Sequence, residues 1–255
     1  MMNKKKYRFK YVPVDELEYD ANNVRLYNKP EIVLALLTDG PGKNLARSML
    51  RIGYLPSYPM TIVNNTVIDG NVRLAAINIY VKQQPYLDFA MSFSQFDDVI
   101  PGADKLQEIP CIVYHSIEDA LVSIGFEHLY RSKWNSFQRA LYFQRLVSLG
   151  KDASFIADVT SHAQSGIERH LDALDIYQEY GYTDHARHLG LMDMLRYNGV
   201  NEFHSKHPDT MKQILDDNAP STDLGSKLSK ILHNHLYRDL LIMGHSVDEV
   251  YSLAS

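Results

Sequence analysis

The first half of the chain alternates short β-type hydrophobic runs with one helical run. Residues 60–63 and 66–68 are β-rich runs separated by two asparagines. A polar two-residue turn between two such runs predicts a β-hairpin. A glycine follows, a helix is expected at 72–81, and another buried strand is expected at 109–114. This order of elements predicts a mixed-sheet domain.

From residue 117 onward the hydrophobic positions follow the spacing of helices instead. Leu121, Ile124 and His128 would share one helix face. Further helices are expected at 137–149, 152–159 and 164–180. After residue 183 the chain is also mainly helical, with breaks expected near Pro208, Pro220 and Gly225.

These patterns predict an α+β protein in three parts. A small domain with a mixed sheet would occupy 1–115, a helical region with a helix-turn-helix 116–180, and a C-terminal helical region 181–255. A stretch at 83–107, rich in aromatic residues, is expected to be an ordered insertion whose role the sequence does not reveal. An expected helix at 44–52 precedes the hairpin.

Composition narrows the classes of function. The chain has 255 residues and a formal net charge of -5. A protein that coats nucleic acid would be basic, so any nucleic-acid contact here must be local. Cys111 is the single cysteine, which excludes an intrachain disulfide and a cysteine-based zinc cluster and fits a reducing compartment. No apolar run suits a signal peptide or a membrane span, so we expect a cytoplasmic protein. His185 and His188 are expected to be surface residues, not zinc ligands.

The strongest local signal is the segment 67–76. A strand is expected to end at Asp69, Gly70 to make a turn, and a helix to begin. Unpaired N–H groups at a helix start bind anions, and Gly70 would let the backbone approach closely. Arg73 could donate to phosphate oxygens from the first turn, and we expect it to contact phosphate, not to support the core. The alternative is a plain connection in which Arg73 pairs with Asp69.

This segment resembles the glycine-to-arginine motif of the ParB N-terminal domain, whose usual form is Gly-Glu-Arg-Arg. Other segments follow in the family's order. Residues 12–17, with Arg25, resemble the family's opening strand and its arginine, and residues 44–63 resemble the helix, loop and strand that follow. Residues 109–113 resemble the strand that closes the domain. Residues 127–131, with Asn135, resemble the family's Glu-Asn-x-x-Arg motif. The resemblance to ParB/sulfiredoxin-like proteins covers roughly 11–180.

The resemblance implies a pocket for nucleotide phosphates. It places Gly70, Asn71 and Arg73 around the phosphates, with Glu127 holding a magnesium-triphosphate unit and Arg131 contacting it. ParB clamps use CTP and sulfiredoxin uses ATP, so the implied cofactor is CTP or ATP with Mg²⁺, and Glu127 is the metal-binding residue. A carboxylate and phosphate oxygens are the ligands that magnesium prefers.

Three departures from the family pattern remove charge from this pocket. Asn71 stands where the family has Glu, Val72 replaces the first Arg, and His128 replaces Asn beside Glu127. Nucleotide identity and hydrolysis therefore stay open at the level of sequence.

A second candidate site lies at 156–171, which has helix-turn-helix spacing. The motif resembles the ParB helix-turn-helix from 156 to 174, except that Ser161 replaces the usual turn glycine. Gln164, Ser165, Arg169 and His170 are expected to face outward and to contact DNA, since Gln pairs with adenine and Arg with guanine. The alternative is a helical hairpin with a solvated face, which the acidic residues Glu168, Asp172 and Asp175 favour.

Together these features favour a nucleotide-responsive DNA-binding protein of ParB type. A rival interpretation is an enzyme on the same fold, a nucleoside triphosphatase, phosphotransferase or nuclease that uses Asp69, Glu127 and magnesium. A third is an adaptor whose pocket is inactive. The expected partners are DNA and a nucleotide, and the C-terminal helices could also form a homodimer, although no heptad pattern supports this.

Overall fold

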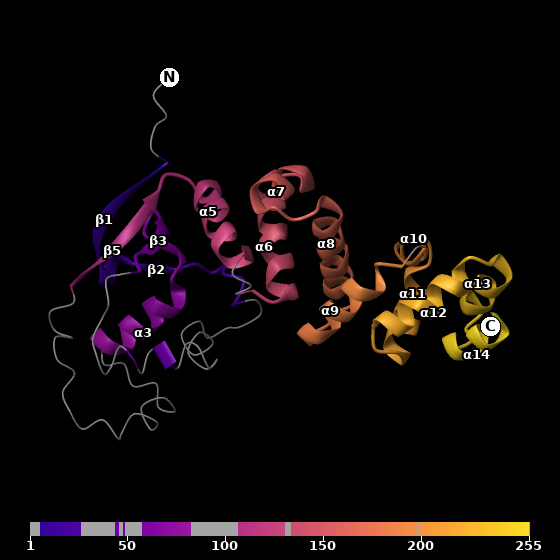
Figure 1. Cartoon of the computed structure of the whole chain (residues 1–255). Coiled ribbons are helices and arrows are strands. Elements are labelled where there is room, and N and C mark those ends of the chain that lie inside the picture. Colours follow the sequence, from indigo (N-terminus) through magenta and orange to yellow (C-terminus); the bar gives the residue numbers. More distant parts are fainter. Residues whose placement is uncertain are drawn as a thin grey trace. The chain divides into compact units, whose positions relative to one another are not determined.

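The computed structural model describes residues 6–26, 44–45, 48, 58–82, 107–130, 134–197 and 199–254. The chain divides into two compact units, Met1–Arg131 and Ser132–Ser255 (Figure 1). Unit 1 contains a five-stranded sheet and helices, and the described part of unit 2 consists of helices. The protein is therefore α+β, as expected.

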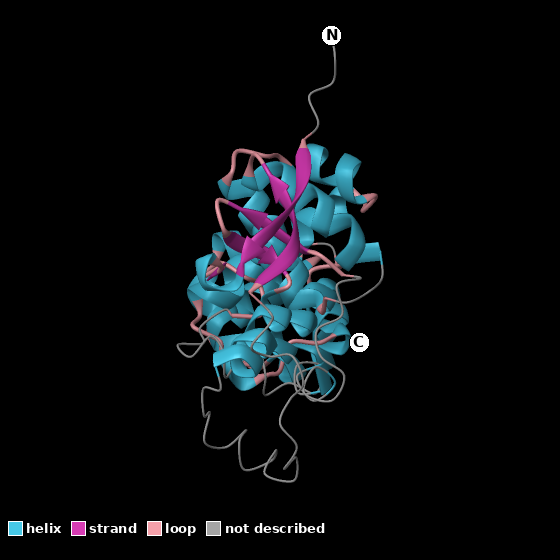
Figure 2. Ribbon diagram, turned by 90° about the vertical axis from the view of Figure 1, so that its left-hand side faces the viewer, coloured by secondary structure: helices cyan, strands magenta, loops and turns pink. Residues whose placement is uncertain are grey.

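Unit 1 is built around a mixed sheet with the strand order β1-β5-β3-β4-β2. Figure 2 shows its strands in magenta. β1 pairs antiparallel with β5, β5 parallel with β3, β3 antiparallel with β4, and β4 parallel with β2. The elements are β1 (Tyr7–Pro13), a 3-10 turn (Val14–Glu16), β2 (Glu18–Tyr19), β3 (Met60–Val63), β4 (Thr66–Asp69), α3 (Asn71–Lys82), β5 (Glu108–Tyr114) and α5 (Ile117–Tyr130).

The hairpin predicted from the two asparagines is confirmed. Asn64 and Asn65 connect β3 to β4 with φ angles of 48° and 66°. Two consecutive positive φ angles are the mark of a type I′ turn, whose twist matches that of the flanking strands. The expected helix at 44–52 and the insertion at 83–107 lie almost wholly outside the described residues.

The core of unit 1 lies between the sheet and α3. It contains buried side chains from the sheet and from α3: Val12, Met60, Ile62, Val67, Leu74, Ile77, Ile109 and Cys111. Burial raises the pKa of the Cys111 thiol to about 11. α5 packs on β3, β4 and β5. The predicted inward face of α5 is confirmed, because Leu121, Ile124 and His128 are all buried.

Unit 2 is a series of helices with well-defined starts. Asp152 caps α7 by accepting from the Phe155 N–H at 2.7 Å, as expected, and Asn135 caps α6 through a capping box with Gln138. The helices are α6 (Ser136–Ser148), α7 (Ala153–Thr160), α8 (Gln164–Glu179), α9 (His185–Met194), α10 (Val200–Lys206), α11 (Pro208–Asp217), α12 (Thr222–Leu232), α13 (His235–Ile242) and α14 (Val247–Ala254).

Two glycines allow close packing around α9 and α12. A Cβ on Gly190 would lie 2.0 Å from the Pro220 carbonyl oxygen, and one on Gly225 would lie 2.6 Å from Tyr197 Cδ2. The expected break near Gly225 is therefore wrong, because α12 runs through it and the glycine serves close packing instead. Pro208, by contrast, begins α11. A proline fits the first position of a helix, because an N–H there would have no acceptor within the helix.

The division of the chain differs from the three parts expected from the sequence. α5 belongs with the sheet it packs on, so unit 1 extends past residue 115, and α8 packs on α9 across residue 180. Among the described residues, no helix combines the length and the apolar character needed to cross a membrane.

Candidate functional site

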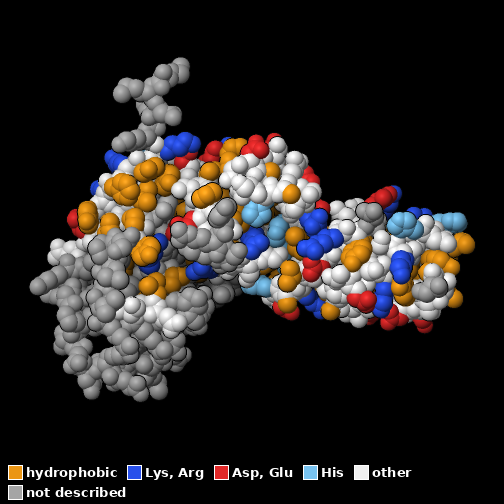
Figure 3. Space-filling view, in the orientation of Figure 1, with side chains coloured by type: hydrophobic (Ala, Val, Ile, Leu, Met, Phe, Trp, Pro, Cys, Tyr) orange, Lys and Arg blue, Asp and Glu red, His pale blue; other side chains and the backbone are white. Residues whose placement is uncertain are grey.

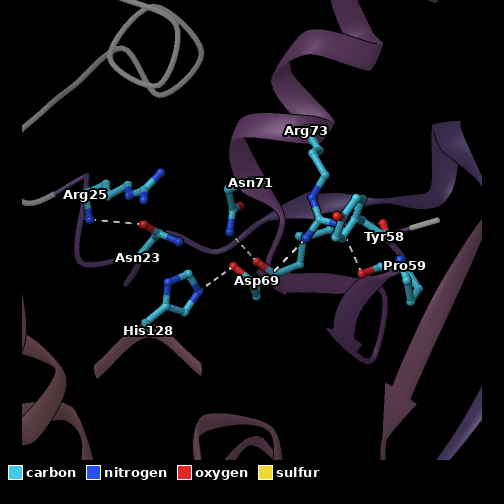
Figure 4. Close-up of polar contacts among 9 residues, drawn as sticks. Asn23, Arg25, Tyr58, Pro59, Asp69, Asn71, Arg73 and His128 are labelled. Carbon is cyan, nitrogen blue, oxygen red and sulfur yellow. Dashed lines mark hydrogen bonds and ion pairs between the residues drawn. The ribbon is translucent and has the colours of Figure 1, made fainter. Parts of the chain in front are cut away.

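The turn between β4 and α3 has the backbone geometry expected for an anion site (Figure 4). β4 ends at Asp69 and α3 begins at Asn71. Gly70 between them has a φ of +107°, and a Cβ there would lie 2.9 Å from Met60 Cγ. Only glycine fits this position without strain.

The start of α3 offers backbone donors. The Leu74 N–H donates to the Gly70 carbonyl at 2.9 Å, which is the first hydrogen bond of the helical pattern. The N–H groups that precede it have no acceptor within the helix, and they carry the positive end of the helix dipole. This end of α3 can therefore bind an anion through its backbone.

The Asn71 side chain has a different role from the one that the resemblance implies. It is 2% exposed. Its Oδ1 accepts from the Asp20 N–H at 3.1 Å, and its Nδ2 donates to the Val67 carbonyl at 2.6 Å. These bonds fasten the end of β2 to β4. A ligand could use the Asn71 backbone N–H, but the side chain is committed to the fold.

Arg73 makes contacts within the protein. Its Nη1 donates to the carbonyls of Tyr58 and Pro59, the latter at 3.1 Å. Its Nη2 lies 3.3 Å from Asp69 Oδ2. The pair with Asp69, foreseen as an alternative, is thus present. The expected contact of Arg73 with phosphate stays a prediction. Arg73 also supports the fold, because it ties the chain entering β3 to the end of β4.

His128 is a member of this site that the sequence revealed only as a departure from a motif. Its Nε2 lies 3.0 Å from Asp69 Oδ1, so the Asp69 carboxylate is held between an imidazole and a guanidinium. His128 is 6% exposed, whereas a quarter of the Asp69 side chain is exposed. The sequence signal for its position was helical spacing: His128 shares one face of α5 with Leu121 and Ile124, and that face is buried.

The structure describes only some of the other residues that the resemblance assigns to a phosphate pocket. Glu127 is exposed on α5, directly before His128, and Arg131 lies outside the described residues. Arg25 follows β2, and its backbone N–H donates to Asn23 Oδ1 at 3.0 Å (Figure 4). Within the described part of the chain, no group of three or more His, Cys, Asp or Glu side chains is arranged to hold a metal ion.

In the second candidate site a tight turn joins α7 to α8, and the helix-turn-helix itself stays a prediction. Ser161 ends α7 in the left-handed conformation, at φ 56°, and α8 begins at Gln164. Gln164 and Ser165 are exposed at the start of α8, and Arg169 is half-buried one turn later. The Gln164 amide donates to Glu168 Oε1 at 2.8 Å.

The expectation that His170 faces outward is wrong. His170 lies three residues after Ile167 and four before Leu174, so it falls on the buried stripe of α8. Its ring centroid lies 5.4 Å from that of Phe143 and 5.9 Å from that of His188. Burial lowers the pKa of His170 to about 3.

His188 is also buried, not at the surface as expected. It is 0% exposed. Its Nδ1 lies 3.2 Å from Ser136 Oγ, and its Nε2 lies 3.4 Å from the His170 carbonyl oxygen. Burial lowers the pKa of His188 to about 4. These two imidazoles are therefore neutral parts of the core of unit 2.

Comparison with solved structures identifies the fold. The C222₁ form of a pNOB8-like ParB N-domain superimposes with a TM-score of 0.51 at 13% sequence identity, over 95% of this chain and 99% of that chain. A second structure of a pNOB8-like ParB N-domain matches at 18% identity with a TM-score of 0.39, over 99% of this chain and 97% of that chain. At 13% identity the first match shows a shared fold. No family model matches the sequence, and no curated protein is similar to it.

Proposed function

We propose that this chain is a ParB-like DNA-binding protein that contacts duplex DNA through the start of α8. The observation that carries the proposal is the exposed beginning of α8, which follows directly on the tight turn at Ser161. In a helix-turn-helix, residues at the start of the second helix contact base edges in the major groove. The ParB N-domain fold and the resemblance of 156–174 to a ParB helix-turn-helix support this role.

The side chains at this helix start suit base recognition. Gln164 can pair with adenine through its amide, and Arg169 can donate two hydrogen bonds to guanine. The rest of α8 is anchored, because Ile167, His170 and Leu174 are buried. The helix can therefore present Gln164 and Ser165 from a fixed frame, although the Gln164 amide must exchange its bond to Glu168 for one to a base.

Acidic residues on α8 limit the contact to the helix start. Glu168 is exposed, and Asp172 accepts from Asn201 Nδ2 at 2.9 Å. Burial, together with the neighbouring Asp175, raises the pKa of Asp172. These carboxylates repel phosphate, so a duplex would approach from the Gln164 end of the helix.

Arg169→Ala should weaken binding to a preferred duplex and relax the preference at one base pair. A bidentate contact between Arg and guanine contributes roughly 1–3 kcal/mol of discrimination. Mobility shifts on an oligonucleotide pool, enriched over several rounds and read at two salt concentrations, measure this. Arg196→Ala is the matched control, because it removes an exposed arginine at the end of α9.

Three outcomes of this experiment are distinct. Loss of discrimination places Arg169 on a base, whereas an even loss across sequences with a shallower salt dependence places it on phosphate. A pool that yields no enriched sequence, with no shift at low salt, contradicts the DNA-binding proposal.

We further propose that unit 1 binds the phosphates of CTP or ATP with Mg²⁺ at the Asp69–Arg73 turn. The positive φ of Gly70 and the N–H groups at the start of α3 support this, and the resemblance implies it. Arg73 would lie beside the phosphates, because its guanidinium is next to the Gly70 turn. A Cβ built on Gly70 would lie 3.1 Å from Arg73 Nη2 and 3.3 Å from Arg73 Cζ. Phosphates that join this turn to Glu127 on α5 would make the protein responsive to nucleotide.

Arg73→Ala should both weaken nucleotide binding and destabilise unit 1. Loss of a charge-assisted hydrogen bond costs on the order of 1.5–3 kcal/mol in either process. Calorimetric titration measures the first effect and urea denaturation the second. Arg73→Lys keeps the charge and should retain more of the binding than of the stability, because a lysine cannot bridge Tyr58, Pro59 and Asp69 at once. Wild-type nucleotide affinity in folded Arg73→Ala protein would remove Arg73 from the site.

Glu127→Gln should reduce magnesium-dependent nucleotide binding and leave metal-free binding nearly unchanged. The substitution keeps the size of the side chain and removes the charge that magnesium requires. Titrations with and without magnesium measure the difference. Glu108→Gln, at an exposed position where β5 begins, is the control. Equal losses with and without magnesium would contradict a metal role for Glu127.

One observation favours an enzyme as a second candidate. The 3.0 Å contact between His128 Nε2 and Asp69 Oδ1 resembles an acid–base pair, and it lies beside the turn proposed to bind phosphates. A phosphotransferase, nuclease or triphosphatase would release product from the nucleotide or from DNA, and Asp69→Asn would abolish this. Stoichiometric binding without product favours the DNA-binding protein. Absence of nucleotide binding favours an adaptor with an inactive pocket. The reason would be that the side chains of Asn71 and Arg73 already form hydrogen bonds within the protein.

A further inference from the structure

Strand β1 forms an open edge of the sheet in unit 1. It stands at one end of the strand order, and among the described residues only β5 pairs with it. Its seven residues, Tyr7–Pro13, alternate between the two faces of the sheet. The outer side of such a strand carries backbone groups to which a further strand can bond.

The hydrogen bonds at the two ends of the β1–β5 ladder show which backbone groups are open. The His115 N–H donates to the Lys6 carbonyl at 3.4 Å, and the Val14 N–H donates to the Gln107 carbonyl at 2.9 Å. Bonded pairs alternate along an antiparallel ladder, and the register between these two ends is continuous. The even-numbered residues of β1 therefore bond to β5. The residues whose N–H and C=O groups point to the open edge are Tyr7, Phe9 and Tyr11.

The side chains of these three residues form an aromatic row on one face of the sheet. Tyr7, Phe9 and Tyr11 are 43%, 70% and 62% exposed. Tyr7 and Phe9 meet edge to face, with ring centroids 6.0 Å apart. Figure 3 shows hydrophobic side chains gathered over the region of β1 and β5. The row can therefore pack against apolar side chains on the same face of an added strand.

Cations occupy the other face of β1. Val12 belongs to the core beneath α3, so Arg8 and Lys10, at even positions of the same strand, lie on the α3 side of the sheet. In the ladder, Lys10 stands opposite Cys111, which belongs to the same core. Arg8 and Lys10 are exposed, and within the described part of the chain neither has an ion-pair partner. The edge thus combines open backbone groups with an aromatic face and a cationic face.

A second copy of β1 does not suit this edge. Antiparallel pairing of two β1 strands would place the cations of the two copies opposite each other, and like charges opposite each other destabilise a sheet. A strand with carboxylates at every second position is complementary instead. Its carboxylates would lie opposite Arg8 and Lys10 in the pairs without backbone bonds, where side chains approach most closely. The apolar side chains between them would lie beside the aromatic row.

We propose that β1 binds an extended acidic segment of a partner protein, which adds to the sheet as a further strand. The segment would alternate acidic residues, which pair with Arg8 and Lys10, with apolar residues, which pack on the aromatic row. In strand addition, main-chain hydrogen bonds give affinity and the alternate side chains give specificity. β1 shares no residue with α8 or with the Gly70 turn, so the inference is independent of both proposed binding sites.

Fluorescence anisotropy of the full chain with labelled synthetic peptides tests the proposal. The probe is a peptide as long as β1 that alternates glutamate with valine. One control peptide has the same composition with its glutamates grouped at one end, and another alternates lysine with valine. The wild type should bind the alternating glutamate peptide and neither control, because only that peptide places carboxylates opposite both cations.

Reversal of the two charges separates ion pairing from damage to the fold. The double variant Arg8→Glu with Lys10→Glu should bind the glutamate peptide about tenfold more weakly, since two opposite-charge pairs become like-charge pairs. It should bind the alternating lysine peptide instead, which an unfolded protein would not do. Lys212→Glu, at an exposed position of α11, is the control and should bind as the wild type does.

A proline at position 9 tests the backbone bonds. The Phe9 N–H points to the open edge, so Phe9→Pro removes a bond to an added strand and none to β5. In protein shown by circular dichroism to be folded, Phe9→Pro should abolish binding of the glutamate peptide. Phe9→Val also loses the ring but keeps the N–H, and it should retain most of the binding. If Phe9→Pro does not fold, the charge-reversed variant decides.

Other results overturn the proposal. One is a wild type that does not bind the alternating glutamate peptide, or that binds the grouped peptide equally well. Another is a charge-reversed variant with the preference of the wild type, or a folded Phe9→Pro protein with its affinity. A wild-type dimer in sedimentation that Phe9→Pro dissociates would assign the edge to a second copy of the chain and would also overturn it.

Discussion

Acidification from pH 7 to pH 5 should destabilise unit 2 by roughly 4 kcal/mol, because two buried imidazoles resist protonation. Burial lowers the pKa of His170 to about 3 and that of His188 to about 4. The nearby side chains of His188, Arg139, His162 and Arg169 lower the pKa of His170 further. His185 likewise lowers the pKa of His188, whereas the hydrogen bond to the His170 backbone raises it.

The direction follows from proton uptake. An unfolded histidine has a pKa of about 6.5, so below that pH the unfolded chain binds protons that the folded chain excludes. Stability is therefore fully present above about pH 6.5 and is lost as the pH falls toward the folded values. Below about pH 3 both states are protonated and the loss stops. Each imidazole contributes about half of the effect at pH 5.

Urea denaturation followed by circular dichroism at a series of pH values measures this loss. His170→Leu should halve the pH dependence and be tolerated, since His170 Nδ1 is buried without a hydrogen-bond partner and leucine has a similar volume. His245→Gln removes an exposed imidazole and should leave the dependence as in the wild type. A His170→Leu protein with the full wild-type pH dependence would show that His170 takes up its proton in the folded state.

Gly190→Ala should destabilise unit 2 by about 3 kcal/mol, the upper part of the range for overpacking a close contact. The added methyl group would lie 2.0 Å from the Pro220 carbonyl oxygen, and a backbone atom cannot rotate away as a side chain can. The gain in helix propensity from glycine to alanine, about 1 kcal/mol, is too small to offset this. Thermal and urea denaturation measure the change.

Gly166→Ala is the matched control. Gly166 lies in α8, and a Cβ there would meet nothing within 4 Å. The same substitution should therefore stabilise the protein by up to about 1 kcal/mol through helix propensity alone. Equal effects at the two positions would mean that α9 does not approach Pro220 as closely as the structure shows.

The features that the sequence predicted well depend on neighbouring residues. The turn at Asn64 and Asn65, the cap at Asp152 and the glycine turn after Asp69 are each specified within a few residues. The sequence therefore predicted the hairpin, the start of α7 and the glycine turn between β4 and α3. Ser161 adopts the left-handed conformation at the end of α7, so the absence of glycine did not prevent a tight turn there.

The features that the sequence missed depend on residues far apart in the chain. A glycine such as Gly225 is typical of a helix break, but α12 continues through it. The close approach of Tyr197 accounts for a glycine at this position. Arg73 has the position of a phosphate ligand, and its carbonyl partners at Tyr58 and Pro59 belong to no recognisable pattern. His170 could have been placed correctly, since its spacing from Ile167 already put it on the buried stripe.

The single cysteine offers a way to time the opening of one unit by itself. Cys111 lies on β5, between β1 and β3, and is wholly buried. With its thiol pKa raised to about 11, almost no reactive thiolate exists at neutral pH in the closed sheet. A thiol reagent should modify the protein only in molecules whose sheet has opened. The labelling rate at neutral pH, where an exposed thiol still forms some thiolate, would thus measure how often unit 1 opens, separately from the acid unfolding of unit 2.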